Sequence, residues 1–240
     1  MFYPNFIRTL VCAFVACSNL STPPIDSDTP VTPSGQNIIV GYRTVSQAQA
    51  AEYNKAGTPV LNKPVVGIQL GNGVYTSPKA GDWLGPPGSW YCIIYADSDK
   101  FNAAAKAWIP KTSGSMKLWW NENNINSYIK SLGISDPSKT LRFSPIDGDD
   151  QHYQMLIPPA LLSGTFSKPL GLTANCVDSV AKLPTNRVDY WSMVGMKGVA
   201  PPNPNCGPNL MEEEVEGVEK APGCSTHSTV EPGGNPNNHS

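Results

Sequence analysis

Residues 67–78 have the sequence Gly67-Ile68-Gln69-Leu70-Gly71-Asn72-Gly73-Val74-Tyr75-Thr76-Ser77-Pro78, and we expect the folded domain to be organised around them. The glycines predict a tight turn, because glycine adopts backbone conformations that other residues avoid. The residues after the turn predict a short strand that presents Tyr75. Such a turn places bare backbone next to an aromatic ring, which suits a flat ligand and suits an ordinary hairpin equally well.

The composition predicts a single domain with loosely structured ends. The chain has 240 residues, and its 24 prolines and 21 glycines are concentrated outside the middle, so the hydrophobic core has to come from the middle. The net charge is −2, and lysine and arginine form no cluster. This charge pattern argues against binding to a phosphate backbone, so we expect no nucleic-acid partner. Separately, we expect the protein to be a monomer.

The N-terminus predicts a secreted protein. Residues 1–18 have the features of a signal peptide, with Arg8 ahead of the apolar run 10–16 and small residues at 16–18, where a signal peptidase cleaves. The run is too short to span a bilayer, so we expect an extracellular mature form without a membrane anchor. Residues 19–36 predict a disordered linker, 37–198 the folded domain, and 199–240 a tail rich in Pro, Gly and Asn.

Four cysteines remain once the signal peptide is removed: Cys92, Cys176, Cys206 and Cys224. In an oxidising compartment they predict two disulfides, and the sequence alone leaves three pairings open. None of them has the Cys-x-x-Cys spacing typical of zinc sites, and the chain has only 3 histidines, so we predict no metal site.

The hydrophobic patterns predict an α+β fold. The predicted strands cover residues 37–44, 90–96, 103–109, 141–143 and 153–157, with a further strand or short helix at 170–180 and a last strand at 189–191. The predicted helices cover residues 47–55, between a Ser46 cap and Gly57, and 118–132, before Gly133. The second helix would carry the adjacent Trp119 and Trp120 into the core.

Three strand segments stand out by their chemistry: Tyr42-Arg43-Thr44, Gly73-Val74-Tyr75-Thr76-Ser77, and Gln151-His152-Tyr153-Gln154-Met155-Leu156-Ile157-Pro158-Pro159. Their order and character resemble the ADP-ribosyltransferase superfamily, over residues 41–159. The run 71–75 is similar to the Gly-x-Gly-x-Tyr of the poly-ADP-ribose polymerase branch, and Tyr42-Arg43 to the arginine branch found in many toxins. The run 154–159 is similar to the Glu-Val-Leu-Ile-Pro that ends the arginine-branch signature.

The resemblance implies two small, mostly antiparallel sheets with short helices and an NAD cleft between them. It implies a secreted, toxin-like effector that takes NAD as a substrate and cleaves its nicotinamide–ribose bond. The reaction would be that of an NAD glycohydrolase, or of a mono-ADP-ribosyltransferase with a protein acceptor.

The residue types fit these roles. A guanidinium such as Arg43 suits a phosphate or ribose, an aromatic ring such as Tyr75 suits nicotinamide, and the Gln154 amide suits a ribose hydroxyl. The resemblance implies Gln154 and Tyr75 as catalytic residues. It implies a cofactor-binding set of Arg43, Thr44, Gly73, Tyr75, Ser77 and His152.

The chain departs from the family pattern at its central position. Gln154 stands where transferases carry the catalytic glutamate, and His152 stands where the arginine branch often has an accessory carboxylate. A neutral amide cannot offset positive charge at the anomeric carbon, and losing such a contribution typically costs about 10²–10³ in rate. Two outcomes stay open. Certain secreted NAD glycohydrolases of a related fold use glutamine, with water as the acceptor; alternatively, the protein is an inactive effector or binding protein on the same scaffold.

Each site residue also has a purely structural interpretation. Arg43 can be a solvated charge at a strand end, Tyr75 can pack within its hairpin, and Gln154 can lie on the polar face of an alternating strand. The acidic residues at 147–150 crowd into one turn, and we interpret them as a solvated loop rather than as paired catalytic carboxylates.

A third hypothesis is carbohydrate binding. Trp83 and Trp90 lie at the edges of a long irregular loop at 79–89, where exposed tryptophans could stack on sugar rings.

Overall fold

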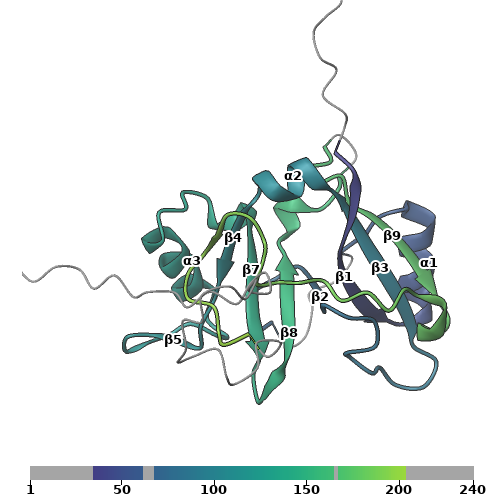
Figure 1. The fold of residues 1–240 in the computed structure, drawn as a ribbon, viewed down its shortest axis with the longest axis horizontal. Helices are drawn as coiled ribbons and strands as arrows, with labels where there is room; N and C mark the ends of the chain where they lie inside the picture. Colours follow the sequence, from purple (N-terminus) through teal and green to yellow (C-terminus); the bar gives the residue numbers. More distant parts are fainter. Residues whose placement is uncertain (1–34, 62–67, 165–166, 204–240) are drawn as a thin grey trace, which may run out of the picture. The chain divides into compact units, whose positions relative to one another are not determined.

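The computed structural model describes residues 35–61, 68–164 and 167–203, all of which belong to one compact unit (Figure 1). The predicted signal peptide, the linker up to residue 34, and the tail from residue 204 onward lie outside these residues. So do Cys206 and Cys224. In the part of the chain that is described, no helix has the length and apolar character needed to cross a bilayer.

Short helices are interspersed among the strands along the chain. The α-helices are α1 (Gln47–Ala56), α2 (Ser98–Ala103) and α3 (Glu122–Ser131), and the 3₁₀ turns are η1 (Pro137–Lys139), η2 (Pro159–Leu161) and η3 (Val180–Lys182). The strands are β1 (Asn37–Val45), β2 (Val74–Thr76), β3 (Trp90–Asp97), β4 (Ala105–Trp108), β5 (Thr112–Ser113), β6 (Met116–Lys117), β7 (Thr140–Ile146), β8 (Asp149–Ile157), β9 (Thr173–Val177) and β10 (Met196–Lys197).

The predicted α+β class is confirmed, and the sheets are mostly antiparallel. One sheet has the strand order β1-β3-β9 and is antiparallel throughout. The other has the order β10-β4-β7-β8-β2, with antiparallel pairs β7–β8 and β8–β2 and parallel pairs β10–β4 and β4–β7. A small ribbon joins β5 to β6. Helix α1 packs on the first sheet next to β9 (Figure 1).

The two sheets share one hydrophobic core. Val40, Ile94 and Ala96 come from the first sheet, and residues such as Phe143 and Met155 come from the second. A second buried cluster lies on the other face of the larger sheet, where α3 contributes Ile125, Tyr128 and Ile129.

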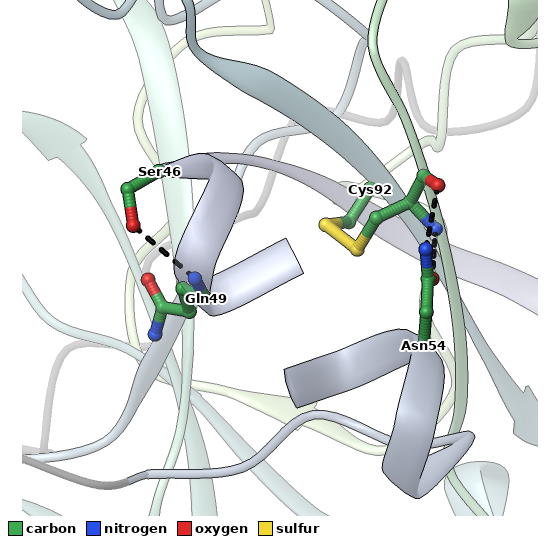
Figure 2. Close-up of a disulfide and its surroundings, with 5 residues drawn as sticks. Ser46, Gln49, Asn54 and Cys92 are labelled. Atoms are coloured by element: carbon green, nitrogen blue, oxygen red, sulfur yellow. Dashed lines mark hydrogen bonds between the residues drawn. A yellow bond between two sulfur atoms is a disulfide. The ribbon is translucent and has the colours of Figure 1, made fainter. Parts of the chain in front are cut away.

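The first helix forms where its capping residues predict it. The Ser46 hydroxyl accepts a hydrogen bond from the Gln49 backbone N–H at 3.2 Å, which satisfies a free donor of the first turn (Figure 2). Gly57 ends the helix with φ 66°, a left-handed conformation that glycine adopts without strain.

A disulfide joins Cys92 of β3 to Cys176 of β9, which face each other in the sheet register. Of the three pairings open from the sequence, the structure contains this one. The Asn54 side chain bonds both the N–H and the carbonyl of Cys176, at 2.8 and 2.9 Å, and so ties α1 to the bridge (Figure 2). With a sequence separation of 84 between the cysteines, the link stabilises the fold by about 4 kcal/mol in the chain-entropy description.

Three predicted elements need correction. The helix expected from residue 118 begins at Glu122, because Asn121 is its N-cap and accepts from the Asn124 N–H at 3.1 Å. The strand expected from residue 103 is preceded by α2, and pairing begins at Ala105. The last strand expected at 189–191 is wrong: these residues are irregular, and β10 lies further on.

Candidate functional site

The three predicted strand segments lie side by side. Tyr42 of β1 and Ser77, just after β2, exchange backbone hydrogen bonds of 2.9 and 2.8 Å. On its other side β2 pairs with β8, with Tyr75 opposite Leu156. Strand β2 therefore links β1 to β8 and one sheet to the other (Figure 1).

The glycine-rich turn is held tightly. Gly71 has φ 106° and Gly73 has φ 153°. A Cβ on Gly73 would collide with the carbonyl oxygen of Ile157, so the close approach of β2 to β8 requires glycine there. The glycines predicted to form a tight turn are therefore needed for two reasons: the backbone conformation of the turn and the close packing of β2 on β8.

Tyr75 closes this turn from within the core. Its hydroxyl accepts from the Leu70 N–H at 2.9 Å and donates to the Gly71 carbonyl at 2.8 Å. The residue is only 4 % exposed, and burial raises the pKa of its phenol to about 12. Because protein atoms enclose the ring, an aromatic face for a ligand has to come from another residue. This corrects the expectation that the turn presents Tyr75.

Arg43, Thr44 and Ser77 use their side chains to tie the strands and loops together. Arg43 Nη1 donates to the Tyr75 carbonyl at 2.7 Å, and its buried Nε has no hydrogen-bond partner among the described residues. The Thr44 hydroxyl donates to the Trp83 carbonyl at 2.5 Å, and the Ser77 hydroxyl donates to the Lys79 carbonyl at 2.9 Å. Ligand contacts of these three residues stay predictions.

Gln154 lines a groove of about 360 Å³ on the face of the larger sheet. The residues that form this groove are Gln69, Trp83, Trp120, Ile146, Asp147 and Gln154. Of the predicted site residues, Gln154 alone belongs to this set. Trp83 of the carbohydrate hypothesis also lines it, whereas Trp90 begins β3 and is not part of it.

The orientation of the Gln154 amide follows from its neighbours. Nε2 donates to the Ser144 hydroxyl at 3.1 Å and to the Pro145 carbonyl at 3.4 Å. The Ser144 hydroxyl itself donates to the Pro145 carbonyl at 2.7 Å, so both neighbours accept from the amide and the NH₂ end has to face them. Within the described part of the chain, Gln154 Oε1 accepts no hydrogen bond, although the residue is only 4 % exposed.

Gln69 differs from Gln154 in that both ends of its amide are used. Nε2 donates to the Ser144 hydroxyl at 3.2 Å and to the Pro145 carbonyl at 2.9 Å, and Oε1 accepts from the Asp147 N–H at 2.9 Å. Gln154 Oε1 is therefore an acceptor without a partner among the described residues, and because it is not one of the fully buried polar atoms it is open to the groove and to a ligand.

Trp120 and Asp147 complete the groove, and sequence reasoning placed neither there. The Trp120 indole donates to Asp147 Oδ2 at 3.0 Å, and Lys111 Nζ lies 2.9 Å from Asp147 Oδ1. These two hydrogen bonds hold the pKa of the Asp147 carboxyl below its usual range, so the group is ionised at neutral pH. The Asn121 cap was the signal that sets Trp120 outside the helix.

His152 is not among the residues that line the groove. Its Nδ1 is 2.7 Å from Asp149 Oδ2, and both residues lie at the start of β8. Across the described residues, no group of three or more metal-ligating side chains gathers. The groove thus consists of an amide floor, aromatic side chains and one carboxylate.

The chain belongs to a family of unknown function, DUF5910, whose pattern matches residues 68–199. The matched region contains β2, β8 and all the groove residues, whereas β1 with Arg43 precedes it. A search among curated proteins finds no match to this sequence.

Proposed function

We propose that the groove binds NAD as a substrate and that the protein is a secreted, ADP-ribosyltransferase-like enzyme that cleaves the nicotinamide–ribose bond. The observation that carries the proposal is the free Oε1 of Gln154 in the groove. An acceptor held rigidly by two neighbours suits a ribose hydroxyl, because no reorganisation is needed when the substrate arrives.

The arrangement of strands supports the same proposal. Strands β1, β2 and β8 are neighbours, as the resemblance to ADP-ribosyltransferases implies for a cleft built on these three segments. Arg43 hydrogen-bonds to the backbone of Tyr75, so the arginine and the glycine-rich turn meet at the junction of the two sheets.

Hydrolysis is the reaction that this site suits best. The bond between ribose C1′ and the nicotinamide nitrogen breaks, water oxygen bonds to C1′, and a proton is released to solvent. Gln154 would hold the ribose while the bond breaks. Water needs less positioning than a protein side chain, so a site with glutamine instead of glutamate favours glycohydrolase activity over transfer to a protein acceptor.

Secretion is part of the proposal. The Cys92–Cys176 disulfide supports it, because such bonds persist in oxidising compartments. The test of the proposed activity is release of nicotinamide from NAD by the purified mature chain. Absence of both turnover and calorimetric NAD binding would remove the proposal.

A second candidate function is a binding protein without activity, and the glutamine at position 154 favours it. Gln154→Glu separates the two functions. If nicotinamide release appears only in this variant, the natural protein is a binding protein on an enzyme scaffold. If the variant loses activity that the natural protein has, glutamine is the working residue.

The Gln154→Glu comparison needs a stability control. A carboxylate cannot donate to the Pro145 carbonyl as Gln154 Nε2 does, but that carbonyl keeps its hydrogen bonds from Ser144 and Gln69, so we expect the lost bond to cost about 0.5–1.5 kcal/mol. Thermal unfolding of both proteins shows whether an activity change reflects chemistry or folding.

A further inference from the structure

We infer that the groove is built for a planar, positively charged ring, with Trp120 as the stacking face and Asp147 as the counter-charge. The ligand class is an N-alkylpyridinium, as in the nicotinamide ring of oxidised NAD. The identity of that ring rests on the proposed function, which this inference deepens, whereas the preference for a cation follows from the groove alone.

Trp120 holds a conformation that needs a reason. Its φ of 67° makes it the one non-glycine residue with a left-handed backbone in the described part of the chain. Large side chains avoid that region, and residues forced into it gather at functional sites. Yet Trp120 is 49 % exposed, so burial in the core does not account for the strain.

Two hydrogen bonds hold Trp120 in the lining of the groove, one from its backbone and one from its indole. The Trp120 backbone N–H donates to the Gln69 carbonyl at 2.9 Å, and the indole Nε1 donates to Asp147 Oδ2 at 3.0 Å. Donation to a carboxylate increases the electron density of the indole ring. Trp is the side chain that attracts a cation most strongly through its ring face, and this contact strengthens the attraction.

Asp147 gives the groove its negative charge. It is the one acidic residue among the six that line the groove, and none of the six is basic. Its partner Lys111 is 62 % exposed and is not one of the residues that line the groove, so Asp147 is the formal charge in the lining itself. The same carboxylate supplies a negative charge that glutamine at position 154 does not.

Gln154 adds an independent reason to expect a ligand here. It is a polar side chain more than nine-tenths buried, it lines the groove, and its Oε1 has no partner among the described residues. Trp83, which also lines the groove, has a buried Nε1 without a partner in the same part of the chain. A ring that carries a carboxamide could satisfy both groups.

The test compares two probes of nearly the same shape, 1-methylnicotinamide, which is a cation, and nicotinamide, which is neutral. Binding to the purified mature chain is followed by tryptophan fluorescence and by calorimetry. We expect the wild-type protein to bind the cation about 5–20-fold more tightly, the range that a cation–π contact with a nearby carboxylate supports. Asp147→Asn should remove this preference. Asp150→Asn, an equal charge change at an exposed position of the same hairpin, should keep it.

Trp120→Gly tests the aromatic contact. Glycine adopts the φ of 67° without strain, which offsets the lost packing, so the variant should melt within about 3 °C of the wild type. Its affinity for the cation should nevertheless fall at least fivefold. If this variant does not fold, Trp120→Asn serves the same purpose, because asparagine also tolerates the left-handed region.

The outcomes separate this inference from the proposed function. Equal binding of both probes by the wild type, or an unchanged preference in Asp147→Asn, overturns the inference. Release of nicotinamide from NAD, with equal binding of the cationic and the neutral probe, would keep the proposed function and overturn the inference. Tighter binding of 1-methylnicotinamide than of nicotinamide, without release of nicotinamide from NAD, would keep the inference and make the protein a binding protein without activity. Binding of saccharides in place of either probe would overturn both.

Discussion

Replacing Arg142 with methionine should loosen the turn on which the groove depends. The Arg142 guanidinium is buried in the larger sheet, where Nη1 donates to the Leu70 carbonyl at 2.6 Å and Nη2 donates to the Pro137 carbonyl at 3.1 Å. Nη2 also donates to Asn126 Oδ1 at 2.9 Å, which ties α3 to the same group. The residue thus joins the glycine-rich turn, α3 and β7.

The expected cost can be worked from these contacts. Hydrogen bonds to a charged group contribute about 1.5–3 kcal/mol each, and two buried carbonyls lose their donor. The 3.4 Å contact with Glu122 adds little, because that carboxylate is 47 % exposed. Releasing the guanidinium from burial returns part of the loss, so we expect Arg142→Met to lower the free energy of unfolding by about 3 kcal/mol.

Urea unfolding monitored by tryptophan fluorescence measures this change, with Glu122→Gln as the matched control. The control leaves the carbonyl contacts of Arg142 in place, so it should cost less than about 1 kcal/mol. A loss under 1 kcal/mol for Arg142→Met, or equal losses for both variants, would refute the role assigned to this arginine.

Three further changes test the framework around the groove. Replacing Cys92 and Cys176 together by alanine should cost about 4 kcal/mol of unfolding free energy in urea, and a loss below 1 kcal/mol would contradict the bridge as a stabilising link. Gly73→Ala should destabilise by at least about 2 kcal/mol, measured by thermal unfolding, because a Cβ meets the Ile157 carbonyl; a neutral effect would show that β2 can move away. Burial lowers the pKa of Lys106 from 10.5 to about 8, so at this site the unfolded chain binds more protons between these values, and Lys106 should contribute stability that rises with pH from 8 to 10. Unfolding curves across this range should show a shallower rise in Lys106→Met, and identical slopes would disprove the assignment.

Local signals explain why much of the fold could be predicted. Strand β1 follows from an apolar, β-branched run, and α1 follows from Ser46 and Gly57, whose effects act within a few residues. The pairing of Cys92 with Cys176 could not be predicted, because it depends on β3 and β9 meeting across 84 residues of chain.

The candidate site was harder to predict for a physical reason. A glycine-rich turn followed by tyrosine has the same sequence whether the ring faces a ligand or packs on its own turn, and Tyr75 does the latter. The orientation of the Gln154 amide depends on Ser144 and Pro145 across a strand pair. The position of Asp147 depends on Gln69, 78 residues away, so no local pattern could place it in the groove.

The rate of nicotinamide release from NAD, measured side by side for the wild type, Gln154→Ala and Gln151→Ala, tests the proposed function most directly. Gln151 is an exposed glutamine on the same strand, so its variant controls for the loss of an amide outside the groove. We predict release by the wild type, a loss of about 10²-fold or more in Gln154→Ala, and a rate within about twofold of the wild type in Gln151→Ala. Equal rates for the two variants, or no release by the wild type, would contradict the assignment of Gln154 and its groove to NAD.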